Sequence, residues 1–409
     1  MKKFDIPEQY KSAIIGEIKN RRKIADPRKQ DFVPSELSLG NITFIFPRHF
    51  GFCYGVENAI ERSYKAIREN PGKRIFLLSP MIHNPAVNED LAGYGLRFIL
   101  DTESRQLIPW SEINSEDVVI IPAFGTTIET EKLLHEKGVE LARYNTTCPF
   151  VEKVWKRSAE IGQNGFTIII HGKYKHEETR ATFSHSYQNA PSIIVRDLKE
   201  VEIIGSYMKG AIDKSAFMSH FKEKVSDGFD PEKDLQRVGV VNQTTMLATE
   251  TQEIADYFKQ VMMIKHGDQI KEHFADTRDT LCYATNDNQQ STLASLDCGA
   301  DLALVVGGYN SSNTSQIVTI LAQRFSTYFI QDSGELLSEQ TIQHFNYERQ
   351  ELIQTENWLP KKEQLRVLIT SGASCPDTVL EEVIARIIHF RPAIISPEEA
   401  LVHFMPTKA

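Results

Sequence analysis

The amino-acid sequence predicts an α/β protein whose sheets are mainly parallel. Short runs of β-branched residues alternate with amphipathic segments of helical periodicity, which is typical of crossover connections between parallel strands. The predicted strands span residues 42–46, 75–78, 118–121, 167–170, 238–241, 302–306 and 367–369, and the helices between them include 56–68 and 151–161. A chain of 409 residues exceeds what one hydrophobic core organises, so about two to four domains are expected.

Three cysteines mark a coarse division of the chain, because Cys53, Cys148 and Cys282 each open about one third of it. The predicted segments are an N-terminal extension (1–39) and three α/β domains (40–147, 148–281, and 282–409 with the C-terminal tail). The extension contains a helical pattern near residues 9–23. A polar, irregular stretch at 198–234 is interpreted as an insertion in the second domain.

Composition excludes several classes of function. A net charge of −9 disfavours nucleic acid or an anionic membrane as the main partner, since both are usually bound through basic surface. The longest apolar runs, such as 302–306, fall far short of the ~20 residues that a membrane helix needs. The N-terminal segment is basic but has no apolar stretch, so we expect a cytoplasmic protein. Its basic cluster, 19–29, is interpreted as a solvated face, with partner docking as the alternative.

Five cysteines are too few and too scattered for a disulfide framework in a chain of this length. Cys53, Cys148 and Cys282 each precede a helical pattern, and a helix N-terminus favours the thiolate that binds metal. The chain has no CxxC motif, so ligands would come from three separate segments. The alternative is that all three are small buried apolar residues. We expect Cys298 and Cys375 to be buried and structural.

Four polar motifs follow predicted strands, where ligands bind in open parallel sheets. They are HGKYKHEETRAT, NQTTM, GGYNSSNTS and TSGASCPD. GGYNSSN and TSGAS combine glycine with short hydroxyl and amide side chains before helices, which suits a backbone nest for phosphate oxygens. The same residues also serve as helix caps and turns, so this second interpretation stays open. No Walker loop or dinucleotide fingerprint is present.

The first of these motifs contains His176, Glu177 and Glu178, an imidazole next to two carboxyl groups. One carboxyl held near the imidazole can deliver a proton to a departing hydroxyl. The alternative is a solvent-exposed charged loop. His83, in MIHNPAVNED, also stands between a strand and a helix, although a lone histidine is more often a structural hydrogen-bonding group.

The motifs GFCYGVENAI, IHNPAVN, TTCPFVEKVW, HGKYKHEET, NQTTM, LCYATNDNQ, NSSNTSQI and SGASCPD occur in this order along the chain. Together they closely resemble the LytB family of 4-hydroxy-3-methylbut-2-enyl diphosphate reductases, in its longer branch with an N-terminal extension. The resemblance implies a trefoil of three pseudo-equivalent α/β domains around one [4Fe-4S] cluster bound by Cys53, Cys148 and Cys282. It also implies an open iron for the substrate hydroxyl, Glu178 as proton source and Thr244 orienting the reacting end. The implied diphosphate ligands are His83, His176, Ser311, Ser312, Asn313 and Ser374.

The activity that the resemblance implies is the two-electron reductive dehydroxylation of an allylic alcohol diphosphate. The products are isopentenyl and dimethylallyl diphosphate, in the last step of the non-mevalonate isoprenoid pathway, and ferredoxin or flavodoxin is the implied electron donor. One departure is visible: Phe124 stands where many members carry a phosphate-binding histidine, and Lys173 or Lys175 is a candidate substitute. The rival interpretations are a [4Fe-4S] dehydratase or synthase without net reduction, and a non-catalytic iron-sulfur or zinc-binding sensor.

Overall fold

A computed structural model describes residues 4–275 and 280–406 of the chain. The chain divides into two compact units, and each is described by itself. The first unit comprises Met1–Glu57, His83–Asn88 and Tyr283–Ala409, and the second comprises Asn58–Ile82 and Glu89–Cys282.

The first unit is built on a five-stranded sheet with the order β1-β2-β14-β10-β11. Its strands are β1 (Ser35–Ser38), β2 (Ile42–Phe46), β10 (Leu302–Val306), β11 (Thr327–Ile330) and β14 (Leu365–Ser371). β1 is an antiparallel edge strand, and the other four pair in parallel. Because parallel strands end at the same edge of a sheet, the loops that follow β2, β10 and β14 lie together.

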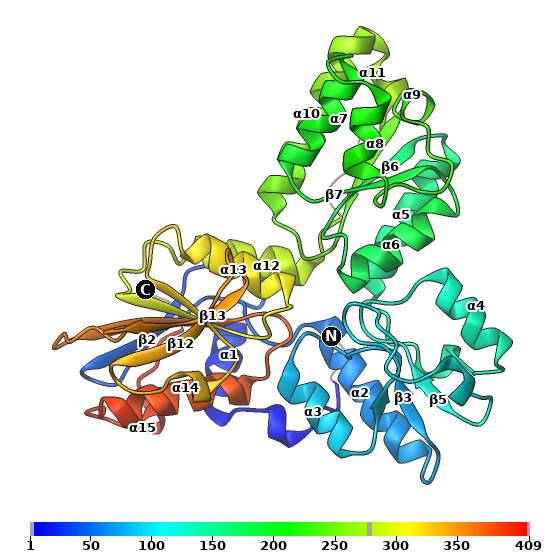
Figure 1. Cartoon of the computed structure of the whole chain (residues 1–409). Coiled ribbons are helices and arrows are strands. Elements are labelled where there is room, and N and C mark those ends of the chain that lie inside the picture. The colour runs from blue at the N-terminus through cyan, green and yellow to red at the C-terminus, as the bar shows by residue number, and fades with distance from the viewer. Residues whose placement is uncertain (1–3, 276–279, 407–409) are drawn as a thin grey trace. The chain divides into compact units, whose positions relative to one another are not determined.

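Helices cover both faces of this sheet (Figure 1). They are α1 (Ala13–Ala25), α12 (Tyr283–Leu293), α13 (Ser312–Leu321), α14 (Asp377–Phe390) and α15 (Pro397–Val402), with a hairpin of β12 (Thr341–Asn346) and β13 (Glu351–Glu356). Successive strand residues point to opposite faces. Phe44 therefore packs into the core that α1 and α14 share, and Ile45 packs into the core that α13 closes.

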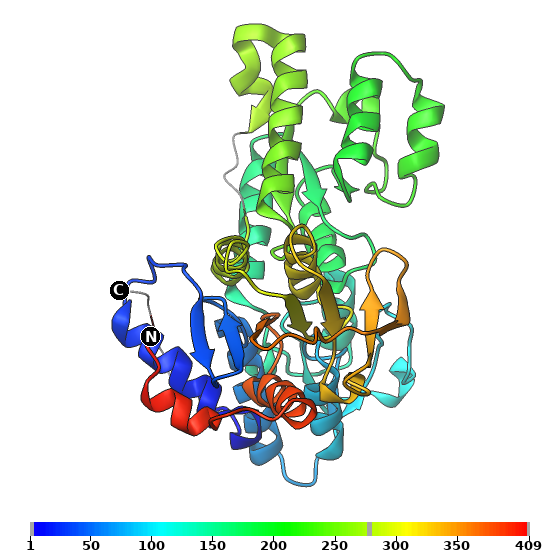
Figure 2. The same cartoon turned by 90° about the vertical axis from the view of Figure 1, so that its left-hand side faces the viewer.

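The N-terminal extension is an integral part of the first unit. Helix α1 contacts α14 and α15, and Figure 2 shows it beside these C-terminal helices. Ile14, Ile15 and Ile18 are buried in the same core as the central strands. The sequence predicted a helix at 9–23, and α1 begins four residues later because Ser12 is its N-cap and accepts a hydrogen bond from the N–H of Ile15.

The second unit has two parallel sheets. The three-stranded sheet β4-β3-β5 is formed by β3 (Ile75–Leu77), β4 (Arg97–Phe98) and β5 (Val118–Ile120). Its unit also contains α4 (Ile128–Glu136) and the later residues of α2 (Tyr54–Glu69) and α3 (Pro85–Gly93), whose first residues are assigned to the first unit. The four-stranded sheet β7-β6-β8-β9 is formed by β6 (Thr167–His171), β7 (Ser192–Val195), β8 (Val238–Asn242) and β9 (Phe274–Ala275). Its helices are α5 (Pro149–Gln163), α6 (Glu177–Tyr187), α7 (Leu198–Met208), α8 (Lys214–Phe221), α9 (Pro231–Asp234), α10 (Ala248–His266) and α11 (Ile270–His273).

All seven predicted strands are present, and the prediction of mainly parallel sheets is confirmed. The stretch 198–234 is not irregular as expected, because it forms α7, α8 and α9. Its residues Ile204, Phe217 and Phe221 are fully buried in the core of the four-stranded sheet. β2, in the predicted 40–147 segment, pairs in parallel with β14, in the predicted 282–409 segment.

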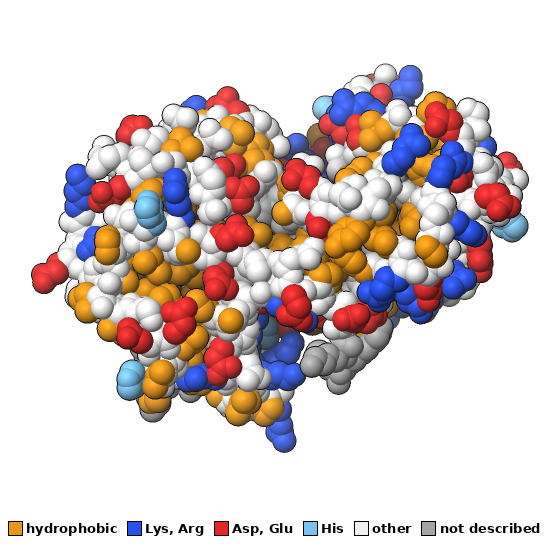
Figure 3. Space-filling model, turned by 90° about the horizontal axis from the view of Figure 1, so that it is seen from below, with side chains coloured by type: hydrophobic (Ala, Val, Ile, Leu, Met, Phe, Trp, Pro, Cys, Tyr) orange, Lys and Arg blue, Asp and Glu red, His pale blue; other side chains and the backbone are white. Residues whose placement is uncertain are grey.

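Charged side chains of both signs are interspersed on the face drawn in Figure 3. Among the described residues, no helix is long and apolar enough to cross a membrane.

Candidate active site

Each of the three candidate ligand cysteines lies directly before a helix, as the sequence predicted. Helices α2, α5 and α12 begin at Tyr54, Pro149 and Tyr283, the residues that follow Cys53, Cys148 and Cys282. Cys148 is the N-cap of α5, with proline at the first helical position. All three cysteines are half-buried. Their sulfur atoms thus lie where unpaired helix N–H groups favour negative charge.

Two opposing effects act on the pKa of the Cys53 thiol. Burial raises its pKa, and the backbone N–H groups of Gly55 and Val56, in the first turn of α2, act in the opposite direction. Cys375 is fully buried, which raises its pKa strongly and agrees with a structural role. Cys298 is half-buried, not buried as expected, because it packs only at the margin of the core under α13.

Within the described residues, no group of three His, Cys, Asp or Glu side chains is close enough to hold a metal ion. Cys53 belongs to the first unit, and Cys148 and Cys282 belong to the second. The candidate site is therefore described below as one part in each unit.

In the first unit, the backbone of Ala373 links α13 to the loop of residues 47–53, which we call the Cys53 loop. Its carbonyl accepts a hydrogen bond from the N–H of Cys53 (3.3 Å), and its own N–H donates to Oδ1 of Asn313 (3.0 Å). The next residue, Ser374, donates from Oγ to the backbone carbonyl of His83 (3.1 Å). Four segments far apart in the sequence thus meet beyond the carboxyl ends of β2, β10 and β14.

The N-terminus of α13 supplies polar groups to the part of the candidate site that lies in the first unit. Ser311 is its N-cap, and its Oγ accepts from the N–H of Thr314 (3.2 Å). Oδ1 of Asn313 also accepts from Nδ2 of Asn288 (3.2 Å). Ser311, Ser312, Asn313 and Ser374 are all buried.

The amide nitrogen of Asn313 is a buried donor that has no hydrogen-bond partner among the described residues. Buried polar groups in native proteins are nearly always paired, so this donor is available to an acceptor outside the described residues. The backbone approaches closely here, since a Cβ on Gly308 would collide with the carbonyl of His83.

In the second unit, Glu178 and Thr244 are in direct contact. The N–H of Thr244 donates to Oε1 of Glu178 (2.6 Å), and the Thr244 carbonyl accepts from the N–H of Cys282 (3.4 Å). β6 and β8 are neighbours in the sheet, so the loops after them lie side by side. Burial raises the pKa of Glu178 to about 7, although the hydrogen bonds from Thr244 lower it. A carboxyl group with this pKa can act as a general acid near neutral pH.

His176 is the N-cap of α6, not part of an exposed loop. Its Nδ1 accepts from the N–H of Glu178 (3.1 Å), which places the proton of the neutral imidazole on Nε2. The ring of Phe124 meets the imidazole edge-on, with ring centroids 5.7 Å apart. Phe124, the residue expected from the resemblance to replace a family histidine, therefore contacts His176.

Glu177 contacts a different element from Glu178. Its Oε1 accepts a short hydrogen bond from the hydroxyl of Ser79, which follows β3. Burial raises the pKa of Glu177 to about 8. Both carboxyl groups are buried, so the interpretation of an exposed charged loop is wrong.

Sequence reasoning missed several groups that support these residues. Asn242 and Thr280 hold the segment before Cys282, since Oδ1 of Asn242 accepts from the N–H (2.9 Å) and the hydroxyl (2.6 Å) of Thr280. Oε1 of Gln243 accepts from the N–H of Lys173 (3.1 Å) and so fixes the loop after β6. Asn242 and Gln243 are the first two residues of the NQTTM motif, so the sequence did indicate them. The sequence did not indicate the backbone contacts of Ala373.

Comparisons with known proteins identify the family of this chain. Residues 45–388 match the family model described as LytB protein, and the chain belongs to this family. A curated relative from Gloeobacter violaceus, named 4-hydroxy-3-methylbut-2-enyl diphosphate reductase, is 37% identical over 391 residues, covering 95% of this chain and 89% of the relative. A relative of the same name from a Synechococcus strain is 39% identical over 385 residues, covering 94% and 91%.

Solved structures show the same fold. A structure of (E)-4-hydroxy-3-methyl-but-2-enyl diphosphate reductase, described as the terminal enzyme of the non-mevalonate pathway, is similar with a TM-score of 0.51 and 26% identity, covering 85% of this chain and 99% of that chain. The E-1-hydroxy-2-methyl-but-2-enyl-4-diphosphate reductase from Plasmodium falciparum is similar with a TM-score of 0.59 and 18% identity, covering 85% and 88%.

Proposed function

We propose that this protein is a 4-hydroxy-3-methylbut-2-enyl diphosphate reductase, the activity for which its relatives are named. The observation that carries the proposal is the position of Thr244, whose backbone contacts both the carboxyl group of Glu178 and the N–H of Cys282. An acid that is protonated near neutral pH is thereby connected through one residue to a candidate cluster ligand.

The reaction replaces the hydroxyl of the allylic alcohol diphosphate with hydrogen. Two electrons and two protons are consumed, the C–O bond breaks, and water and either isopentenyl or dimethylallyl diphosphate are formed. A proton source next to the departing hydroxyl lowers the barrier for this step, since hydroxide is a poor leaving group. Glu178 is our candidate for that source, and Thr244 holds its carboxyl group in place.

The diphosphate is proposed to bind at the N-terminus of α13. Helix N-termini attract anions through their free N–H groups, and Ser311, Ser312 and Asn313 occupy the first turn of this helix or its cap. The unpaired amide of Asn313 is a donor suited to a phosphate oxygen. Ser374 and His83, which are joined by a hydrogen bond, are the other proposed diphosphate ligands in the first unit. His176, at the N-terminus of α6, is the proposed ligand from the second.

We propose that Cys53, Cys148 and Cys282 bind one [4Fe-4S] cluster. The three cysteines suit such a cluster, because each thiol is half-buried and directly precedes a helix. Backbone N–H groups at a helix N-terminus stabilise the negative charge of a thiolate ligand. When bound, the cluster supplies the two electrons one at a time and a Lewis-acidic iron. The electrons are proposed to come from ferredoxin or flavodoxin.

A turnover assay on anaerobically purified protein tests this function. With a chemical reductant, we expect the allylic alcohol diphosphate to give isopentenyl and dimethylallyl diphosphate. A dehydratase or synthase would transform substrate equally well without reductant, and a sensor would form no product in either case. Product formation that does not depend on the reductant would overturn the proposal.

A further inference from the structure

The N-terminal extension contacts the residues on both sides of Cys53. The ring of Phe4 meets the ring of Tyr54 edge-on, with centroids 4.9 Å apart. The ring of Tyr10 meets Phe52 in the same manner at 6.0 Å. Phe4 and Tyr10 are both buried, so these contacts belong to the packed interior of the first unit. Two aromatic residues of the extension thus hold the two neighbours of one cysteine.

A third contact lies at the start of the same loop. Nζ of Lys19 forms an ion pair with Asp377 (2.6 Å) and lies 4.5 Å from the ring centroid of Phe50. Gly51 has a φ of +76°, and a Cβ at this position would lie 2.6 Å from Nζ of Lys19 and 2.8 Å from Oδ1 of Asp377. The ion pair therefore lies directly against the backbone that leads into Cys53.

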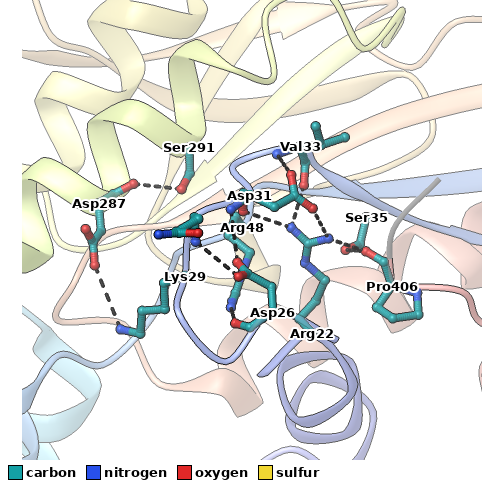
Figure 4. Close-up of polar contacts among 11 residues, drawn as sticks. Arg22, Asp26, Lys29, Asp31, Val33, Ser35, Arg48, Asp287, Ser291 and Pro406 are labelled. Atoms are coloured by element: carbon teal, nitrogen blue, oxygen red, sulfur yellow. Dashed lines mark hydrogen bonds and ion pairs between the residues drawn. The ribbon is translucent and has the colours of Figure 1, made fainter. Parts of the chain in front are cut away.

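The end of the extension contacts the helix that follows Cys282. Nζ of Lys29 lies 3.8 Å from a carboxylate oxygen of Asp287 (Figure 4). It also lies 5.6 Å from the ring centroid of Tyr283. The hydroxyl of Tyr283 accepts a hydrogen bond from the N–H of Tyr54 (3.1 Å). Tyr54 is thus held both by Phe4 and by Tyr283.

The extension itself is firmly anchored. Arg22, only 2% exposed, donates to the carboxylate of Asp31 (3.2 Å), the carbonyl of Val33 (2.8 Å) and the carbonyl of Pro406 (Figure 4). The interpretation of the basic cluster 19–29 as a solvated face therefore fails for Lys19, Arg22 and Lys29, which form ion pairs within the first unit.

We propose that residues 4–29 are a positioning element that holds the Cys53 loop in its cluster-binding conformation, with Phe4 and Tyr10 as the positioning residues. The proposal rests on the proposed function, because it assumes that Cys53 binds a cluster. Contact on both neighbours of the cysteine restricts the loop in a way that packing against one side would not.

The test measures the reactivity of single cysteines in the cluster-free, full-length protein. Iodoacetamide labelling followed by peptide mass spectrometry gives a separate rate for Cys53 and for Cys375. Cys375 is fully buried in the core of the same unit, so its rate reports global unfolding. The variants are Phe4→Ala and Tyr10→Ala, with Tyr10→Phe as the conservative change that keeps the ring.

Phe404→Ala is the matched control. Phe404 is 6% exposed and Phe4 is 8% exposed. Phe404 follows α15 and packs into the core that contains Cys375, and among the described residues it makes no ring contact with the Cys53 loop. We expect Phe4→Ala and Tyr10→Ala to speed the labelling of Cys53 up to about tenfold, since an aromatic pair stabilises a local structure by that order. Cys375 should stay protected, and Tyr10→Phe and Phe404→Ala should behave like wild type at Cys53.

Two outcomes would overturn the proposal. One is an unchanged Cys53 rate in both alanine variants, and the other is an equal rise at Cys53 and Cys375, which means general destabilisation. A second readout uses protein with its cluster, where the alanine variants should lose iron in air faster than Phe404→Ala. Wild-type protein without iron would instead show that the proposed function has failed, whatever the labelling rates are.

Discussion

The backbone N–H of Thr244 donates a 2.6 Å hydrogen bond to Oε1 of Glu178, and the two residues follow adjacent parallel strands, β8 and β6. This contact holds a carboxyl group that burial keeps protonated up to about pH 7. Thr244 also accepts a hydrogen bond from the N–H of Cys282, so one residue contacts both the candidate proton donor Glu178 and a candidate cluster ligand.

Glu178→Gln is expected to lower kcat by about 10² to 10⁴, because glutamine keeps the size and accepts the hydrogen bond but has no acidic proton to give. Iron content and substrate affinity should stay at the wild-type level. Glu177→Gln is the control, since Glu177 is also buried but accepts its hydrogen bond from Ser79 instead. A larger loss of kcat in Glu177→Gln than in Glu178→Gln would contradict the assignment.

The pH dependence of kcat follows from the pKa of Glu178, which is raised to about 7. A general acid must be protonated, so kcat should be constant below that pH and fall by about tenfold per pH unit well above it. The residual activity of Glu178→Gln should lack this decline. A wild-type rate that rises between pH 6 and 8 on the order of tenfold would speak against an acid role.

Glu177 should make stability depend on pH. Its pKa in the folded protein is about 8 against an ordinary 4.5, so the folded state holds a proton that the unfolded state has lost between these values. Its stabilising contribution is therefore complete below about pH 4.5 and is lost as the pH rises through about 8, by at most ~1.4 kcal/mol per unit.

Denaturant unfolding of wild type and Glu177→Gln over this range checks the prediction. The variant should gain stability relative to wild type as the pH rises, because glutamine is neutral throughout. An advantage of the variant that shrinks towards high pH would show that Glu177 is not buried in its protonated form.

Asn313→Ala and Ser374→Ala are expected to raise KM about 5- to 150-fold, which corresponds to about 1 to 3 kcal/mol for each lost hydrogen bond to a charged group. Ser311→Ala should also raise KM, but it removes the N-cap of α13 as well. Ser396→Ala is its matched control, since Ser396 caps α15 with a similar bond to the N–H of Glu399. If KM is unchanged in all three site variants, the diphosphate binds elsewhere.

The sequence predicted the central strands well because buried parallel strands are continuous apolar runs, as in the residues 302–306 of β10. It missed the hairpin of β12 and β13, because most of its residues are polar and β13 is largely exposed. Helices α7 to α9 were misjudged because their Lys and Asp residues obscured the spacing of apolar residues such as Phe217 and Phe221.

Candidate site residues were predicted from residue type and from the position after a strand. Their contacts were not predictable, because they depend on the order of strands in the sheets. The Glu178–Thr244 contact requires β6 beside β8, and the link from Cys53 to Asn313 runs through the backbone of Ala373. A backbone group carries no signal of residue type, so only the structure identifies this link.

Iron analysis of cysteine variants tests the central claim most directly. Anaerobically purified wild-type protein should contain about four irons per chain, and replacing any one of Cys53, Cys148 or Cys282 by serine should abolish the cluster signal in EPR after reduction. Cys298→Ser is the control, because Cys298 is half-buried like the three proposed ligands. It should keep the wild-type iron content. Retention of the cluster in Cys53→Ser, or its loss in Cys298→Ser, would contradict the account.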